Sequence, residues 1–234
     1  MRRTKIICTM GPATDNEDVL RDLMLNGMDV ARLNFSHGSH EEALERINRI
    51  KKVRDELNIP VAILLDTKGP EVRIKDFKEG KVELKEGQKF TLCTDDVVGD
   101  ENQVSITYAN LPNDVKVGSK ILIDDGLIEM EVISVKNSKI LCKVKNGGVV
   151  SNKKGVNVPN VALSMPYMSQ KDIDDILFGI EQDVDFIAAS FVRTANDIRE
   201  IKTLLRDNGG RDIRIIAKIE NAEGVDNIDD IIRE

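Results

Sequence analysis

The chain has 234 residues, a length that suits one large domain or two modest ones. Hydrophobic residues make up 41% and charged residues 32%, which excludes disorder and collagen-like repeats, while the 3% of aromatics and the absence of Trp predict an aliphatic core. The net charge of −7 and the lack of a basic run with interleaved aromatics exclude nucleic acid as the expected partner.

The sequence shows no signal for a membrane or for an oxidising compartment. No apolar stretch approaches the ~20 residues of a membrane-spanning helix, and the apolar run after the basic N-terminus stops at Gly11-Pro12, too early for a signal peptide. Cys8, Cys93 and Cys142 are far apart and form no C-x-x-C pair, so neither a disulfide framework nor a zinc site is expected. A cytoplasmic protein without membrane contact fits these features best.

The first part of the chain alternates short β-branched runs with amphipathic segments. Strands are expected over 5–10, 28–35 and 61–65, and helices begin at two sequences of capping-box form, Thr14–Glu17 and Ser39–Glu42. Connections this short imply parallel strands joined by right-handed crossovers.

Between Gly69 and Pro166 the helical period is lost. Short alternating runs, at 81–84, 89–92, 104–108, 120–123, 128–135 and 140–144, predict an antiparallel barrel or sandwich. After Pro166 the first pattern returns, with a helix from Ser169, a strand over 185–192, a helix over 194–207, a strand over 213–219 and a last helix near Val225. The sequence therefore predicts one α/β sheet interrupted by a β insert.

Polar residues end the second predicted strand. Ligands of parallel α/β proteins bind at the carboxyl ends of the strands. Period-two alternation places Arg32, Asn34 and Ser36 on one face, opposite Leu33 and Phe35. A partly buried Arg requires a partner, either a bound anion or an ion pair inside the sheet, and the pattern favours neither.

The third predicted strand ends in Asp66 and Thr67. Together with Asn34 and Ser36 these residues supply the oxygen donors that a hard cation requires. The alternative to a cation site is an ordinary turn that leads into a hairpin and contains Pro70.

The last predicted strand ends with Lys218 and Glu220 on one face. One interpretation is a cation that stabilises a phosphate beside a metal-binding carboxylate, and the other is a simple ion pair. His37 and His40 flank a helix start, where solvated side chains are usual. The sequence holds neither G-x-G-x-x-G nor a P-loop, which disfavours a dinucleotide fold or an ordinary ATPase.

Taken together and in this order, the motifs resemble pyruvate kinase of a bacterial type over the whole chain. They are Thr4-Lys5-Ile6 through Gly11-Pro12-Ala13, Ala31-Arg32-Leu33-Asn34-Phe35-Ser36-His37-Gly38, Leu65-Asp66-Thr67-Lys68-Gly69-Pro70-Glu71, Gly126-Leu127-Ile128, Lys153-Lys154-Gly155-Val156-Asn157, Ile187-Ala188-Ala189-Ser190-Phe191-Val192-Arg193 and Lys218-Ile219-Glu220-Asn221.

The resemblance implies a function and a fold. The function is phosphoryl transfer from phosphoenolpyruvate to ADP, giving pyruvate and ATP in glycolysis, with Mg²⁺ or Mn²⁺ and K⁺ as cofactors. The fold class is α/β, a partial TIM (β/α)8 barrel of about five of its eight strands, interrupted by an all-β lid domain. The implied domains are 1–68 and 167–234 for the barrel and 69–166 for the lid. A complete member of the family is expected to be a homotetramer.

The resemblance also implies residue roles. It implies phosphate or substrate contacts by Arg32, Arg73 and Lys218, nucleotide contacts by Asn34, His37, Arg73 and Lys154, K⁺ ligands at Asn34, Ser36, Asp66 and Thr67, K⁺ dependence through Glu71, a divalent-metal ligand at Glu220, and Lys218 as the catalytic residue that stabilises the transferring phosphoryl group.

The family's second metal carboxylate lies in an Arg-Gly-Asp stretch that this sequence does not contain. The sequence therefore predicts an N-terminal portion that is inactive when isolated. Two alternatives remain: a non-catalytic fragment that binds nucleotide or a partner, and another barrel enzyme acting on phosphoenolpyruvate or pyruvate, such as a metal-dependent lyase.

Overall fold

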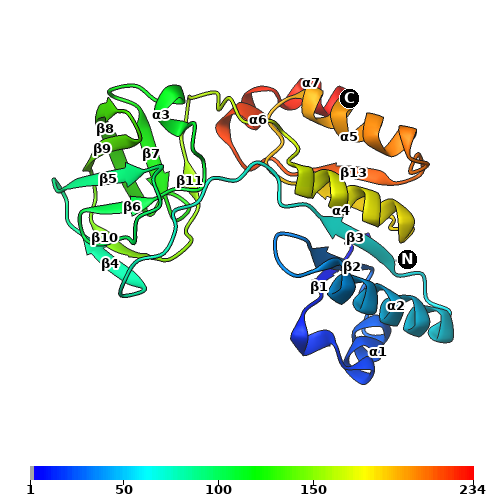
Figure 1. Cartoon of the computed structure of the whole chain (residues 1–234). Helices are drawn as coiled ribbons and strands as arrows, with labels where there is room; N and C mark the ends of the chain where they lie inside the picture. Colours follow the sequence, from blue (N-terminus) through cyan, green and yellow to red (C-terminus); the bar gives the residue numbers. More distant parts are fainter. Residues whose placement is uncertain (1–2) are drawn as a thin grey trace. The chain divides into compact units, whose positions relative to one another are not determined.

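The computed structural model describes residues 3–234, which divide into two units. The first unit runs through Pro70 and also includes Tyr167–Glu220 and Asn227–Glu234. The second comprises Glu71–Pro166 and Asn221–Asp226. Figure 1 follows the chain as it leaves the first unit in cyan, builds the second in green and returns to the first in yellow.

The first unit is a parallel sheet with helices between its strands. Its elements are β1 (Ile7–Thr9), a 3-10 turn (Pro12–Thr14), α1 (Glu17–Leu25), β2 (Val30–Asn34), α2 (His40–Leu57), β3 (Ala62–Asp66), α4 (Gln170–Glu181), β12 (Phe186–Ala189), α5 (Ala195–Asp207), β13 (Arg214–Ala217) and α7 (Ile228–Arg233). The five strands pair in the order β1-β2-β3-β12-β13, which is chain order. Strand order that follows chain order is the arrangement of a (β/α)8 barrel, whereas a doubly wound sheet reverses direction. The first unit therefore has the topology of part of a barrel.

Three of the four long helices begin as the sequence predicts, and one does not. Ser39 caps α2 by accepting a hydrogen bond from the Glu42 amide, without the full capping box predicted there, and Ser169 and Thr194 form capping boxes at α4 and α5. The box expected at Thr14 is wrong, because the Thr14 hydroxyl bonds the Gly11 carbonyl and closes the 3-10 turn. Asn16 caps α1 instead, its side chain accepting a hydrogen bond from the Asp18 amide.

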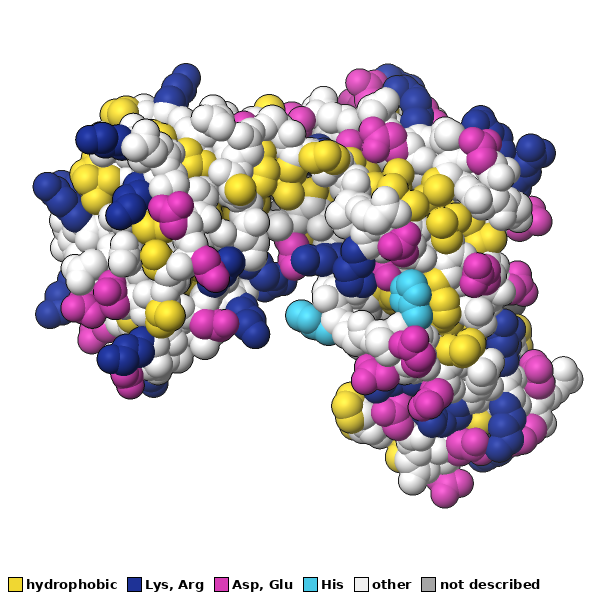
Figure 2. All heavy atoms as spheres, viewed as in Figure 1, with side chains coloured by type: hydrophobic (Ala, Val, Ile, Leu, Met, Phe, Trp, Pro, Cys, Tyr) yellow, Lys and Arg dark blue, Asp and Glu magenta, His cyan; other side chains and the backbone are white. Residues whose placement is uncertain are grey.

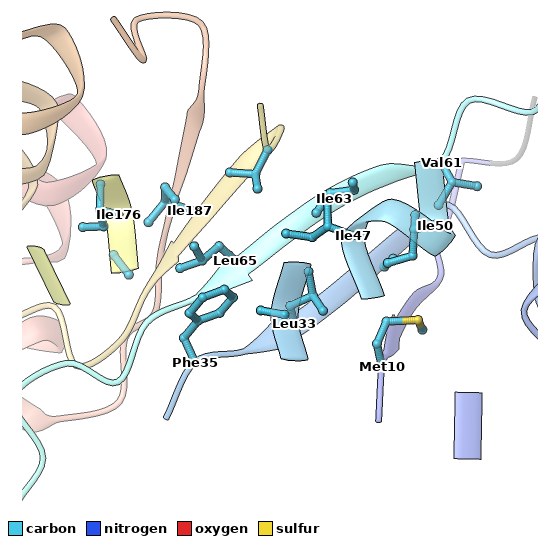
Figure 3. Packing of buried hydrophobic residues seen from close by; sticks show 14 of the residues in the cluster. Met10, Leu33, Phe35, Ile47, Ile50, Val61, Ile63, Leu65, Ile176 and Ile187 are labelled. Carbon is cyan, nitrogen blue, oxygen red and sulfur yellow. The ribbon is translucent and has the colours of Figure 1, made fainter. Parts of the chain in front are cut away.

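One face of the parallel sheet carries the aliphatic core. Alternate strand residues such as Leu33, Ile63 and Leu65 are at most 3% exposed and pack against Ile47 and Ile50 of α2. Figure 3 shows these side chains directed into one cluster. The alternation predicted for β2 is confirmed as far as Asn34, since Leu33 is buried while its strand neighbours Arg32 and Asn34 are not. Ser36, predicted on the same face, lies in a turn beyond the end of the strand. The polar residues of the strand ends are therefore directed away from this core.

The second unit is mostly antiparallel β structure. Its elements are β4 (Lys81–Leu84), β5 (Lys89–Cys93), β6 (Gln103–Ser105), α3 (Leu111–Asp114), β7 (Lys120–Ile123), β8 (Ile128–Lys136), β9 (Lys139–Val144), β10 (Gly148–Ser151), β11 (Val156–Asn157) and α6 (Ala222–Asp226). Six strands form a sheet in the order β11-β7-β8-β9-β5-β6, and β10 pairs with β4. Two details differ from the prediction: β5 and β6 are parallel, and the short helix α3 follows β6. A core of Val, Ile and Leu side chains with Phe77 and Phe90 fills this unit.

The last predicted helix is in fact two short helices, α6 and α7. Asn227 lies between them and its side-chain amide donates to the carbonyl of Arg193, two residues before the start of α5, so the backbone here is tied to that segment rather than continuing a helix. Among the described residues, no helix is both long and apolar enough to cross a membrane.

Candidate active site

The carboxylate of Asp66 joins side chains from three strands of the first unit. Asp66 is the last residue of β3 and is 2% exposed. Its Oδ2 accepts a hydrogen bond from Nε of Arg32 on β2 at 2.6 Å, and its Oδ1 accepts one from Nζ of Lys218, directly after β13, at 2.8 Å. The structure thus brings Arg32, Asp66 and Lys218 together, and the partner of Arg32 in this structure is a carboxylate of the sheet.

Strand register explains this meeting. Asp66 pairs with Asn34 of β2 on one side and with Ala188 of β12 on the other. Arg32 lies two residues before Asn34, and Lys218 follows the residue paired with Ala189. Since side chains two residues apart share a face, all three polar groups project from one face of the sheet near its carboxyl edge.

Ser190 is a site residue for which the sequence analysis assigned no role. It follows β12, is 2% exposed, and its hydroxyl donates to the Thr67 carbonyl at 2.6 Å. The Ser190 hydroxyl oxygen also accepts a hydrogen bond from Lys218 Nζ at 2.8 Å. The signal in the sequence was a lone hydroxyl ending an apolar run at the carboxyl end of a strand. With Asp66, Ser190 fixes the position of the Lys218 ammonium.

Glu220 lies beside Lys218 and holds a strained turn. Its Oε1 is 3.5 Å from Lys218 Nζ, and its Oε2 accepts a hydrogen bond from the Phe191 amide at 3.0 Å. Phe191 has a φ of +54°, in the left-handed region that bulky side chains rarely adopt. Strain of this kind persists where the surroundings impose it, and it is typical of binding and catalytic sites.

The remaining predicted oxygen donors of the first unit gather at the ends of β2 and β3. Asn34 is exposed, and its Oδ1 accepts a hydrogen bond from the Ser36 amide at 3.0 Å. The hydroxyl of Thr67 is buried and contacts the Ala188 carbonyl and the Ser190 amide.

His37, the predicted nucleotide contact, is exposed in the turn before α2.

This donor set suits hard cations. Within residues 3–234 no three His, Cys, Asp or Glu side chains gather as a metal site, so any ion here would depend on amide, hydroxyl and carbonyl oxygens. Asn34, Ser36, Asp66 and Thr67 supply such oxygens, the type that hard cations prefer. Glu220 supplies one exposed carboxylate, and Mg²⁺ is commonly held by one or two carboxylates together with substrate phosphates.

Three predicted residues belong to the second unit. Arg73 Nε donates to Oε2 of Glu71 at 2.8 Å, and this hydrogen bond raises the pKa of the Arg73 guanidinium. A second nitrogen of Arg73 donates to the Lys153 carbonyl at 2.8 Å. Lys154 pairs with Asp124 at 2.9 Å. Lys154 is therefore ion-paired within its own unit.

The His40 side chain is 38% exposed, but it has a buried carboxylate as its partner. Its Nε2 lies 2.7 Å from Oδ1 of Asp175 on α4, a carboxylate that is 1% exposed. Both histidines of the chain still reach the surface, where Figure 2 shows them in cyan. The sequence could not reveal this pair, because 135 residues separate its members.

Comparison with known proteins shows the family of this chain. The family model described as "Pyruvate kinase, barrel domain" matches residues 1–234. The chain belongs to the pyruvate kinase family. It is 49% identical to a pyruvate kinase of Clostridium perfringens over 100% of this chain and 49% of that protein. It is 54% identical to the Geobacillus stearothermophilus pyruvate kinase and 50% identical to that of Staphylococcus aureus (strain MRSA252), each over 99% of this chain and 40% of the relative. The chain thus spans half or less of the length of the pyruvate kinases it matches.

Proposed function

We propose that this chain takes part in phosphoryl transfer from phosphoenolpyruvate to ADP, with formation of pyruvate and ATP. The observation that carries the proposal is the convergence of Arg32 and Lys218 on the buried Asp66 at the carboxyl edge of a barrel-type sheet. A transferring phosphoryl group passes through a loose transition state, so catalysis depends on positioned positive charge more than on covalent chemistry. Membership of the pyruvate kinase family favours this reaction over that of a metal-dependent lyase.

Lys218 is proposed as the catalytic residue. Two hydrogen bonds, from its ammonium to Asp66 and to Ser190, hold the charge in place before substrate arrives, so little reorganisation is needed at the moment of transfer. Arg32 is proposed to bind the phosphate of phosphoenolpyruvate, because a guanidinium matches phosphate oxygens in a bidentate way.

The proposed cation contacts follow the donor chemistry. Asn34, Ser36, Asp66 and Thr67 would hold K⁺, and Glu220 would hold Mg²⁺ or Mn²⁺. The bound ions would supply positive charge that neutralises the phosphate oxygens. Glu71 is proposed to determine the dependence on K⁺.

The second unit is proposed to be the lid, with the domain division 1–68, 69–166 and 167–234. Arg73 and Lys154 would contact nucleotide phosphates from this unit, and Asn34 and His37 would do so from the first. Closure of a lid excludes the water that would otherwise intercept the phosphoryl group.

The test joins this chain to the part of the Geobacillus stearothermophilus relative that lies outside the match, and measures pyruvate formation in a coupled assay. Turnover that requires ADP, phosphoenolpyruvate and Mg²⁺ is the expected result. A folded chimera without turnover, beside an active intact relative, would contradict the proposal.

A further inference from the structure

Three rings meet where the β2–α2 loop contacts α4. His40 stacks on Phe178 with ring centroids 4.5 Å apart and planes at 18°. Phe35 completes the group, with its centroid 6.1 Å from that of His40 and 5.9 Å from that of Phe178. The chain has only six Phe, two Tyr and two His residues, so this cluster gathers three of its few aromatic rings at one place.

Asp175 fixes the His40 ring in this cluster. The Asp175 carboxylate is 1% exposed and has two partners, His40 Nε2 at 2.7 Å and Lys171 Nζ at 2.7 Å. A carboxylate only accepts hydrogen bonds, so Nε2 of His40 carries the hydrogen. Burial of a carboxylate destabilises the fold unless the carboxylate is hydrogen-bonded and paired, so loss of either partner would lower the stability. The ring of His40 is therefore held by its edge and by its face at once.

Phe35 connects this cluster to the candidate site. It lies between Asn34 and Ser36 in the sequence, and its side chain is 5% exposed within the aliphatic core. Figure 3 shows the Phe35 ring in this core, at the end of β2. Because adjacent residues at the end of an extended strand point to opposite sides, the position of Phe35 sets the direction of Asn34, the last residue of β2. Ser36 lies in the turn beyond the strand, and its amide donates to Asn34 Oδ1, which ties Ser36 to the same segment.

We propose that His40 is a positioning residue for the β2–α2 loop: held by Asp175 and stacked on Phe178, it fixes Phe35 and thereby orients Asn34 and Ser36. The contact joins segments from the two sides of the insert in the sequence, because β2 precedes the second unit and α4 follows it. The consequence for cation and nucleotide binding by Asn34, Ser36 and His37 rests on the proposed function. The positioning itself does not.

Amide hydrogen exchange in the 234-residue chain tests the positioning. The amide of Phe35 donates to the Asp66 carbonyl and that of Ser36 to Asn34 Oδ1, so both report on loop opening. In His40→Ala we expect both amides to exchange about tenfold faster, the equivalent of one hydrogen bond to a charged group, while the amides of β12 are unchanged. His40→Gln keeps a side-chain N–H at similar reach, and it should restore exchange to within about threefold of the wild type.

A matched control separates positioning from simple loosening of α2. Lys51 Nζ donates to the Gln182 carbonyl at 2.7 Å and forms a second contact between α2 and the end of α4. Lys51→Met should leave exchange of Phe35 and Ser36 unchanged. Equal acceleration in Lys51→Met and His40→Ala, no acceleration in His40→Ala, or no rescue by His40→Gln would overturn the proposal.

A spectroscopic signature adds a direct readout. A chain labelled with ¹⁵N-histidine has two imidazoles, and a His37→Gln variant assigns them. The Nε2–H resonance of His40 should shift in Asp175→Asn while that of His37 stays in place, and an unchanged His40 resonance would contradict the contact.

Calorimetric titration with ADP in the presence of Mg²⁺ and K⁺ then examines the consequence. Weaker ADP binding in His40→Ala than in the wild type would link the loop to the proposed site. If the wild type binds no ADP while loop exchange follows the expected pattern, the proposed function fails and the positioning role of His40 stands.

Discussion

Oδ1 of Asp66 lies 2.8 Å from Nζ of Lys218, although 152 residues separate them in the sequence. The second carboxylate oxygen of Asp66 is engaged by Arg32, so one buried acid balances two cations. Removing this carboxylate leaves two partly buried cations without their shared partner. The position of the Lys218 ammonium and the stability of the sheet edge therefore depend on the same group.

We expect Asp66→Ala to lower the free energy of unfolding of the first unit by about 3 kcal/mol, because the partly buried Arg32 and Lys218 would lose the carboxylate that they share. Urea titration followed by far-ultraviolet circular dichroism measures it. Asp207→Ala breaks the exposed pair with Arg206 and serves as the control, with an expected loss of about 0.5 kcal/mol or less. Similar losses in the two variants would contradict this account.

Lys218→Met should separate chemistry from binding. In the active chimera we expect kcat to fall by about a thousandfold, because a preorganised charge at the transferring group is lost, while the KM for ADP changes by less than about threefold. Steady-state kinetics measures both constants. Lys202→Met, which removes an exposed lysine on α5, is the matched control and should leave both unchanged. Equal loss in kcat and in ADP affinity would refute the role given to Lys218.

Gly69 is expected to tolerate no side chain. It has a φ of +67°, and a Cβ there would lie 2.7 Å from the Ser190 carbonyl oxygen. Gly69→Ala should therefore cost more than about 2 kcal/mol of folding free energy, by strain and by displacement of Ser190. Gly209 also has a positive φ, +88°, but faces open space, so Gly209→Ala should cost only about 1 kcal/mol. Chemical denaturation of both variants makes the comparison, and equal costs would remove Ser190 from the explanation.

The loop after β1 should show a defined pH dependence. Hydrogen bonds from Arg46 to Asp15 lower the pKa of this carboxyl below its ordinary value of 3.8. A lowered pKa contributes stability that is complete above the ordinary value and is lost as the pH falls through the lowered one. The difference in unfolding free energy between wild type and Asp15→Asn should thus be constant from about pH 5 to 7 and shrink below pH 3.8. A difference that persists undiminished in strong acid would be inconsistent with this pair.

Thiol reactivity should distinguish the three cysteines. Burial raises the pKa of the Cys142 thiol to about 12, and the pKa of Cys93 is raised by burial as well. Since the thiolate is the reactive form, Cys142 should be alkylated about a thousandfold more slowly in the native chain than in urea. Cys8 is only partly buried and should react first. Mass spectrometry of timed iodoacetamide reactions measures the order, and early labelling of Cys142 would contradict it.

Local sequence features determined the elements and much of the site. The alternation of Arg32, Leu33 and Asn34 predicted which face of β2 is polar, and the structure confirms it. The caps at Ser39 and Ser169 were visible because capping depends on residues three positions apart. The residues that end β2 and β3 or follow β13 could also be identified as candidates from local sequence, because side-chain direction along a strand follows from a period of two.

Tertiary structure alone decided which partner each polar group has. Nothing in the sequence shows that Asp66 is shared between Arg32 and Lys218, or that Ser190 contacts that lysine. Nor does it show that His40 pairs with Asp175, which lies 135 residues later in the sequence. Local periodicity gives the direction in which a side chain leaves the backbone. Which two directions meet depends on strand register and helix docking, and these are fixed only when distant segments bury their apolar faces together.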